Sequence, residues 1–489
     1  MKSLSPTDAL FLMIEQRRQP MHVAGLHIYA PPIGAGKDFV KNLVDSWRKH
    51  LHAVEPFNLK PVSQHGVWHW EVDTEFDLDN HFFHLALPWP GRVRELLAQV
   101  SQLHGALLDR SGPLWEMYVI EGLADGRFAL YVKIHHALID GVAGTKLILS
   151  SLSQNAEEMK LPIWAQEQPK RAPRAPLPPS VQRLTQPLFD AIRIGGEILP
   201  GVGSGLMDIL RAGKSTGTMA MPFQAPPTLF NVPISESRRF AAQSYSLARL
   251  KHLGQTAGAT VNDVTLAICA GALRKYLIAQ NGLPEKPLIA MVPVSLHGET
   301  KKDGNQVGMI LVNLATHIVD PVERLRQIVQ STTEAKLRLS KMSRLQKIAH
   351  AAAMLTPFLP SMATGHARKH PIFNVVISNV PGPTMPLYLD GAQLDELYPV
   401  SIPADYMALN ITVSGYGDHL GFGFTACRRS VPVLQRMLDY TAESFVELEE
   451  ALHPEALHPS ETEAAPAAKP RKRKSPAKTA ATRAESESV

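Results

Sequence analysis

Phe128-Ala-Leu-Tyr-Val-Lys-Ile-His-His-Ala-Leu-Ile-Asp-Gly141 is the stretch that decides the fold and the chemistry expected of this chain. Its first half alternates like a strand, in which every second residue shares a face. One face would carry Phe128, Leu130, Val132, Ile134 and His136, and the other Tyr131, Lys133 and His135. A helical pattern follows from Val142 to Leu152. The stretch therefore predicts a histidine at the point where a buried strand passes into a helix.

His136 has the chemistry of a general base in that position. A neutral imidazole, with an ordinary pKa of about 6.5, can accept a proton from a hydroxyl at neutral pH. Gly141 permits close approach to the backbone, and Asp140 is suited to capping the helix or holding an arginine. Two structural histidines, in a chain that has 20, are the alternative. A metal site is disfavoured, because adjacent strand residues face opposite ways and do not converge on one ion.

Strand-like and helix-like patterns alternate in two blocks, which predicts a mixed α/β chain with two domains of similar build. The patterns predict helices at Arg92–Leu108, Asn262–Ala279 and Val322–Leu345, and strands at Arg127–His135, Pro287–Val294, Phe373–Ser378 and Leu409–Ser414. The expected limits are residues 1–160 for the first domain and 236–451 for the second.

A connecting segment, residues 161–235, is expected between the two domains. Leu161–Pro187 is rich in proline and basic residues, a composition that disfavours packed helix or sheet. Leu188–Lys214 is apolar and interrupted by glycine, which favours a bent helix or a membrane-contacting hairpin. Its Gly201-Val-Gly-Ser-Gly-Leu206 is not interpreted as a nucleotide loop, because no strand leads into it and no Lys-Ser/Thr pair completes it. Residues 452–489, rich in Ala, Pro, Glu, Lys and Ser, are expected to be disordered.

Composition and charge exclude several classes of protein. Of the 489 residues, 45% are hydrophobic and 19% charged, which is typical of a globular chain. The net charge is +5, but residues 452–489 hold 7 basic and 5 acidic residues and supply +2 of it. The remaining +3 does not predict a specific nucleic-acid partner, although the basic tail allows weak contact. Cys269 and Cys427 predict no disulfide framework, and no signal peptide or spanning segment is recognised, so a cytoplasmic protein is expected.

The motif His135-His-Ala-Leu-Ile-Asp-Gly141 matches the HHxxxDG pattern of coenzyme-A-dependent acyltransferases related to chloramphenicol acetyltransferase and of peptide-synthetase condensation domains. Further motifs are Gln19-Pro-Met-His-Val, Ala86-Leu-Pro-Trp-Pro-Gly-Arg-Val-Arg-Glu-Leu-Leu, Pro113-Leu-Trp-Glu, Ser237-Arg-Arg-Phe-Ala-Ala-Gln-Ser, Val261-Asn-Asp-Val, Ile289-Ala-Met-Val-Pro, Phe373-Asn-Val-Val-Ile-Ser-Asn-Val-Pro-Gly-Pro and Ala408-Leu-Asn-Ile-Thr. Together they resemble the bacterial wax ester synthase/diacylglycerol acyltransferase family, from about Lys2 to Glu450.

The resemblance implies two chloramphenicol acetyltransferase-like domains, each a mixed sheet with helices, and a tunnel between them. Acyl-CoA would be the co-substrate, with no bound cofactor, and a fatty alcohol or diacylglycerol the acceptor. His136 would deprotonate the acceptor hydroxyl, beside His135, and no acyl-enzyme would form. In that family Asp140 is chiefly structural and the pair Asn262-Asp263 lies near the site. Asn262 is suited to donating to the oxyanion, and capping the following helix is the equal alternative.

Other matches carry weaker chemistry. Pro113, Leu114 and Trp115 would line the tunnel, although Trp115 is also a natural core residue. Asn379 would face the site or end a strand in a turn. Arg238 and Arg239 would meet the phosphates of CoA, or form a solvated face or an internal pair. His297 and the segment Ala404–Met407 depart from the family pattern, and no GxSxG elbow is present to suggest a serine nucleophile.

Two alternatives to the storage-lipid acyltransferase stay open. One is an acyltransferase of the same superfamily with a carrier-protein donor or a different acceptor. The other is a non-catalytic protein that coats lipid inclusions through Leu188–Lys214 and the basic tail. Because one methylene changes binding in an apolar pocket by only about 1–3 kcal/mol, the sequence does not rank wax ester against triacylglycerol synthesis. Association with the inner membrane or with lipid inclusions is expected from the substrates.

Overall fold

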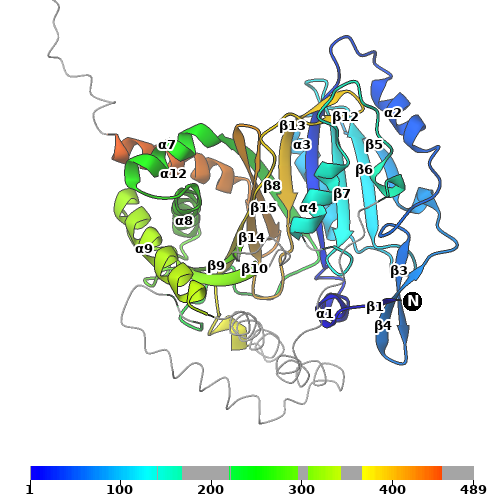
Figure 1. The fold of residues 1–489 in the computed structure, drawn as a ribbon. Coiled ribbons are helices and arrows are strands. Elements are labelled where there is room, and N and C mark those ends of the chain that lie inside the picture. The colour runs from blue at the N-terminus through cyan, green and yellow to red at the C-terminus, as the bar shows by residue number, and fades with distance from the viewer. Residues whose placement is uncertain are drawn as a thin grey trace, which may run out of the picture. The chain divides into compact units, whose positions relative to one another are not determined.

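Two six-stranded mixed sheets form the frame of the protein (Figure 1). The computed structural model describes residues 2–139, 141–167, 220, 222–295, 307–342 and 366–453. The described residues up to Leu452 belong to one compact unit, which contains both sheets. The expected mixed α/β class is confirmed.

The N-terminal sheet has the strand order β12-β13-β2-β7-β6-β5. Its strands are β2 (His22–Ala30), β5 (Phe82–Ala86), β6 (Trp115–Glu121), β7 (Phe128–His135), β12 (Tyr388–Leu389) and β13 (Ala392–Val400). All neighbours are antiparallel except β5 and β6. The sequence places residues 388–400 in the second block, whereas β13 pairs with β2 in this sheet. The chain therefore crosses from the second half back into the first.

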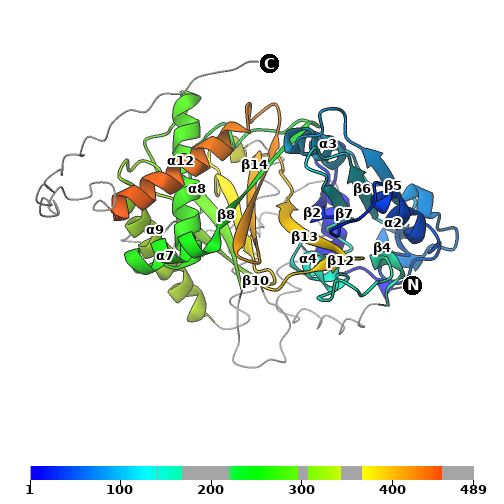
Figure 2. The same cartoon turned by 90° about the horizontal axis from the view of Figure 1, so that it is seen from above.

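The C-terminal sheet has the order β10-β9-β11-β14-β15-β8 and is covered on one face by helices (Figure 2). The strands are β8 (Arg238–Ser246), β9 (Ile289–Ser295), β10 (Val307–Asn313), β11 (Val375–Val380), β14 (Leu409–Tyr416) and β15 (His419–Cys427). The helices are α7 (Leu247–Ala257), α8 (Val261–Ala279), α9 (Pro321–Ser340) and α12 (Arg436–Leu452). Their apolar faces share one core with the sheet. The helices and strands expected in this half are confirmed, with shifted ends.

The N-terminal half contributes its own helices and a small third sheet. The helices are α1 (Pro6–Ile14), α2 (Phe39–Trp47), α3 (Val93–Gly105) and α4 (Gly141–Ser150), and short 3-10 turns lie at Leu78–Asn80 and Ile163–Ala165. A further 3-10 turn, His366–Arg368, lies in the C-terminal half, before β11. The third sheet has the order β1-β4-β3, from β1 (Lys2–Ser3), β3 (Leu59–Gln64) and β4 (Val67–Val72). Trp164 is fully buried, so the proline-rich segment expected from Leu161 begins with packed structure. An indole of this size stabilises by burial despite the neighbouring prolines.

The alternation predicted for residues 128–135 is confirmed, and both faces of β7 are buried. Phe128, Leu130, Val132 and Ile134 belong to one core, with residues of α1, α2 and α4. Ala129 and Tyr131 belong to another, with residues of α3 and β8. A strand sandwiched in this way can present a side chain to a substrate only near its ends.

Two glycines let the sheets approach each other closely. A Cβ added at Gly421 would lie 2.3 Å from the carbonyl oxygen of Leu397, and one at Gly423 would lie 2.0 Å from that of Pro399. Both distances are shorter than van der Waals contact, so only glycine fits on β15 where it packs against β13. The domain limits and the tunnel stay predictions, and Asp140, Leu188–Lys214, residues 201–206, His297 and residues 454–489 lie outside the described residues.

Candidate active site

The histidine pair lies where β7 ends and just before α4 begins, as the sequence predicts. The backbone N–H of His135 donates to the carbonyl of Leu114 at 3.0 Å, and that of His136 donates to the carbonyl of Met21 at 2.8 Å. His135 also stands opposite His22 in the register of β2 and β7. Segments on both sides of β7 therefore hold the pair in place.

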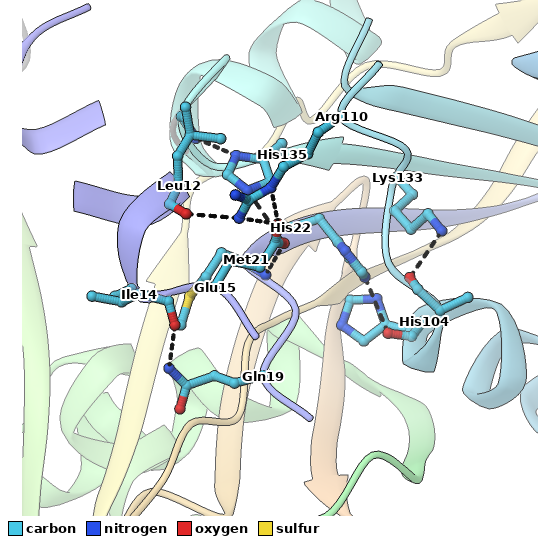
Figure 3. Close-up of polar contacts among 12 residues, drawn as sticks. Leu12, Ile14, Glu15, Gln19, Met21, His22, His104, Arg110, Lys133 and His135 are labelled. Atoms are coloured by element: carbon cyan, nitrogen blue, oxygen red, sulfur yellow. Dashed lines mark hydrogen bonds and ion pairs between the residues drawn. The ribbon is translucent and has the colours of Figure 1, made fainter. Parts of the chain in front are cut away.

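His135 is completely buried and is oriented by contacts at both ring nitrogens (Figure 3). Its Nδ1 accepts a hydrogen bond from the backbone N–H of Ala137 at 3.0 Å. The proton of the neutral ring therefore lies on Nε2, which faces Oε1 of Glu15 at 3.3 Å. With both nitrogens engaged inside the protein, His135 is placed to hold the turn rather than to meet a substrate.

Glu15 is the buried anion of the site, and its side chain is 2% exposed. Its Oε1 accepts from the backbone N–H of Met21 at 2.9 Å, and its Oε2 accepts from Nε and Nη2 of Arg110 at 3.0 and 2.7 Å. Burial alone raises the pKa of Glu15, but His135, the Met21 N–H and Arg110 together hold it below its ordinary value. Glu15 is therefore a carboxylate at neutral pH.

Glu15 and Arg110 are site residues that the sequence patterns do not indicate. The available signal is weak: Glu15 interrupts the apolar stretch that begins at Ala9 and precedes the Gln19-Pro-Met-His motif. Arg110 is 95 positions away in the chain, and only the folded structure brings its guanidinium to that carboxylate.

His136 has different surroundings from His135. It is half-buried, and its ring stacks on the ring of Phe11 in α1, with centroids 4.1 Å apart and planes 25° from parallel. Of the two histidines, His136 is therefore the one with part of its surface accessible. The general base expected at His136 stays a prediction.

A second polar cluster contains His22, His104 and Lys133 (Figure 3). Nε2 of His22 donates to the carbonyl of His104 at 3.0 Å, and His104 contacts Oη of Tyr131 and the carbonyl of Ser401, both at 2.8 Å. Burial lowers the pKa of His104 to about 3 and that of His22 well below its ordinary value. Both rings are therefore neutral near pH 7, and the cluster ties α3 to the end of the sheet.

Lys133 completes that cluster. It is 0% exposed, and its Nζ lies 2.6 Å from Oε2 of Glu116 and 3.3 Å from the carbonyls of Leu103 and Ala106. Burial lowers its pKa, while Glu116 acts in the opposite direction. The ammonium binds carbonyls at the C-terminal end of α3, where a positive charge also interacts favourably with the helix dipole.

The start of α8 corrects one interpretation of Asn262. The N-cap is Thr260, whose Oγ1 accepts from the N–H of Asp263, and Oδ2 of Asp263 accepts from the N–H of Thr260 in return. Asn262 is therefore the second residue of the helix, half-buried, and the expectation that it caps the helix is wrong. Oδ1 of Asp263 accepts from Oγ1 of Thr332 at 2.7 Å, so its carboxylate joins α8 to α9.

The Pro113-Leu-Trp motif is buried, and Trp115 has the contacts of a core residue. Nε1 of Trp115 donates to the carbonyl of Phe57 at 2.8 Å, and its ring stacks on His81 at 4.8 Å between centroids. Leu114 supports the site through its carbonyl, which accepts from His135.

The two arginines at the start of β8 differ. Arg238 is buried and donates to the carbonyls of Ser235 and Arg18, and burial lowers its pKa to about 10. It is an internal arginine. Arg239 is half-buried, and its pKa is lowered by burial and by the like charges of Arg428 and Arg94. Arg239 therefore lies in a region of positive charge, where Arg428 and Arg94 disfavour its protonated form.

The remaining predicted positions are described more briefly. Asn379 is half-buried within β11, opposite Val413 in register, one residue before the strand ends at Val380. Gly141 opens α4 with no atom within 4 Å of an added Cβ. Within the described ranges, no cluster of three or more His, Cys, Asp or Glu side chains is arranged to hold a metal ion. Among the described residues no one helix has the length and apolar character to cross a membrane, although α7 and α8 together, bent by 99°, meet the same criteria.

The arrangement of two six-stranded mixed sheets is a fold that solved condensation domains share. A solved starter condensation domain of rhizomide synthetase shares this fold, with a TM-score of 0.53 over 92% of this chain and 95% of that one, at 11% identity. The likeness concerns the fold alone.

The chain belongs to the wax ester synthase/diacylglycerol acyltransferase family. The model of the wax ester synthase/diacylglycerol acyltransferase catalytic domain matches residues 4–265, and the model of the WS/DGAT C-terminal domain matches residues 303–449. The solved wax ester synthase/diacylglycerol acyltransferase of Marinobacter aquaeolei is 41% identical, with a TM-score of 0.77 over 92% of this chain and all of that one. The O-acyltransferase WSD of Acinetobacter baylyi is 43% identical over 91% of this chain and 96% of its own. A protein of Mycobacterium tuberculosis named as a probable diacylglycerol O-acyltransferase is 44% identical over 92% of this chain and its whole length.

Proposed function

We propose that this protein transfers a long-chain acyl group from acyl-CoA to the hydroxyl of a fatty alcohol or a diacylglycerol, with His136 as the general base. Family membership supports the reaction class, and the names of the similar proteins support the two acceptors. The observation that carries the assignment of His136 is the contrast within the pair. His135 is buried with both ring nitrogens engaged, whereas His136 is half-buried.

The reaction needs one proton to be moved twice. The imidazole of His136 takes the proton of the acceptor hydroxyl while the oxygen attacks the thioester carbonyl. The resulting tetrahedral intermediate expels the CoA thiolate as the carbon–sulfur bond breaks, and the imidazolium returns the proton to that sulfur. The products are an ester and free CoA, and no acyl-enzyme is formed.

Glu15 and His135 supply positioning in this proposal. The Glu15 carboxylate holds the proton-bearing nitrogen of His135, and the backbone N–H of Ala137 fixes the other nitrogen. The turn that carries His136 is thereby anchored from inside the protein. Asn262, near the start of α8, remains our candidate donor to the oxyanion, because an amide can donate without a change in charge.

The donor substrate is acyl-CoA, and no resident cofactor is proposed. We assign the phosphates of CoA to the region of Arg239, Arg94 and Arg428 rather than to Arg238. The lowering of the pKa of Arg239 by the charges of Arg428 and Arg94 supports this choice, since a bound phosphate would relieve their repulsion. Arg238 is committed to backbone carbonyls.

We also propose that the protein works at a lipid surface inside the cell, because its acceptors are lipids. Cys269 and Cys427 are both free, in keeping with a reducing compartment. Flotation with vesicles, compared with protein alone, tests the surface association.

The reaction is tested by measuring CoA thiol release from palmitoyl-CoA with hexadecanol or a diacylglycerol as acceptor. His136→Ala is expected to lower acceptor-dependent release by about 10²- to 10⁴-fold, the usual contribution of a positioned base. The control is His52→Ala, which removes an exposed histidine and should leave the rate unchanged. A folded His136→Ala protein with near-normal turnover would refute the role of His136. A wild-type protein that releases no CoA with either acceptor would favour a carrier-protein donor, another acceptor or a non-catalytic role.

A further inference from the structure

We propose that Phe11 is a positioning residue for the reaction, whose ring holds the imidazole of His136 and stabilises the imidazolium that forms in the transition state. This inference rests on the proposed role of His136 as the base. It starts from the stacked contact between the two rings, with centroids 4.1 Å apart and planes 25° from parallel.

The position of Phe11 is set by the way α1 is anchored at both ends. Oγ of Ser5 caps the start of the helix by accepting from the N–H of Asp8 at 3.1 Å. At the other end, the N–H of Glu15 donates to the carbonyl of Phe11 at 3.2 Å, and Nη2 of Arg110 donates to the carbonyl of Leu12 at 2.7 Å. The short helix therefore has little freedom to slide or rotate.

Glu15 follows α1 directly as its C-cap residue, four positions after Phe11. Glu15 contacts His135 and Phe11 contacts His136, which are adjacent in the chain. One short segment thus holds both histidine rings, the first through a carboxylate and the second through an aromatic face. An apolar residue of the same size at position 11 would fill the space without supplying that face.

The electrostatics favour the charged form of His136. The face of a benzene ring carries partial negative charge and attracts a cation lying over it more strongly than a neutral ring. Because the imidazolium exists only after the proton has left the acceptor hydroxyl, this attraction grows along the reaction. An interaction made mainly in the transition state raises kcat and leaves KM nearly unchanged.

The direct test replaces Phe11 by leucine and by tyrosine. Phe11→Leu is expected to lower kcat by about 3- to 30-fold, the range for a cation–π contact at a partly desolvated site, with KM for palmitoyl-CoA and hexadecanol little changed. Phe11→Tyr keeps the aromatic face and should retain most of the activity. Phe39→Leu is the matched control, because Phe39 is also half-buried on a helix and packs on the same core, beside Phe128.

A double substitution separates this role from general support of the fold. In the His136→Ala background, Phe11→Leu should cause no further loss of the residual activity, since no imidazolium forms there. A further loss as large as that in the wild type would overturn the inference, as would equal losses in Phe11→Leu and Phe11→Tyr.

Fluorinated phenylalanines at position 11 keep the inference testable if Phe11→Leu does not fold. Fluorine withdraws charge from the ring face with little change of shape, so kcat should fall stepwise from one fluorine to five. A flat response would contradict the proposal. If wild-type protein is active and His136→Ala is not, a flat response refutes only the role of Phe11. If His136→Ala keeps its activity, the proposed role of His136 as the base fails, and if wild-type protein releases no CoA, the proposed function itself fails.

Discussion

Glu15→Gln tests the buried anchor of the site. Each group that faces the oxygens of Glu15 is a hydrogen-bond donor. Oε1 accepts from the backbone N–H of Met21 and lies 3.3 Å from Nε2 of His135, and Oε2 accepts two hydrogen bonds from Arg110. A glutamine places an NH₂ group against one of these donor sets whichever way its amide is turned. His135 cannot relieve this by moving its proton, because Nδ1 already accepts from Ala137.

The expected cost follows from leaving buried donors unsatisfied. That penalty is about 1–3 kcal/mol for a neutral group and more for a charged one, so the free energy of unfolding should fall by about 3 kcal/mol at pH 7. Turnover should fall by about 10- to 100-fold, because small displacements of a catalytic group have effects of that size. Glu323→Gln, in an exposed pair with Arg326, is the control and should change stability little.

The pH dependence of that difference gives an independent check. The pKa of Glu15 is lowered in the folded protein, so its contribution to stability is present above its ordinary value of 4.5 and is lost as the pH falls through the folded value. Urea unfolding of both proteins between about pH 7 and pH 3.5 should therefore show the difference shrinking below about pH 4.5. A glutamine variant as stable as wild type at pH 7, or a difference that does not change with pH, would refute the reasoning.

Three further predictions concern other parts of the molecule. Burial lowers the pKa of His27 to about 4, so the unfolded state binds more protons than the folded state between about pH 6.5 and 4. The free energy of unfolding therefore falls by about 1.4 kcal/mol per pH unit in this range, and His27→Phe should remove that loss in urea unfolding. Gly423→Ala should lower the free energy of unfolding by about 3 kcal/mol or more in urea titration, because its Cβ would lie 2.0 Å from the carbonyl oxygen of Pro399, whereas Gly36→Ala, with open space around it, should change little. Arg239→Glu should raise KM for acyl-CoA with little effect on KM for the alcohol, and the effect should weaken in high salt in steady-state assays.

Local patterns were sufficient to predict the elements that carry the site. The alternation of residues 128–135 and the helical run after Val261 depend on neighbours within a few positions, and β7 and α8 lie where the patterns place them. The return of β13 into the first sheet was not predictable in this way. Its pairing with β2 joins residues more than 350 positions apart, and no local period encodes such a partner.

Glu15 and Arg110 are not recognisable as site residues in the sequence for the same physical reason. Glu15 and Arg110 are charged, and charged residues are usually exposed, so neither suggests burial when taken singly. Only their contact in the folded chain makes burial of the carboxylate acceptable. Trp164 is a different case. The surrounding prolines indicate an irregular backbone, but they do not show that this backbone packs on the protein through the buried indole.

The two adjacent histidines have different surroundings because of the geometry at the end of a strand. Adjacent residues on a strand project to opposite faces, so two neighbouring histidines cannot both reach one substrate. In this protein the first is buried against Glu15, and the second stacks on Phe11 and keeps part of its surface accessible. A residue that replaces His135 must therefore donate to the Glu15 carboxylate and accept from the Ala137 N–H. Neither alanine nor phenylalanine can do so. A substitution at His135 should thus reduce both stability and turnover, while one at His136 should reduce turnover alone, and unfolding and rate measurements on the same pair of variants separate the two roles.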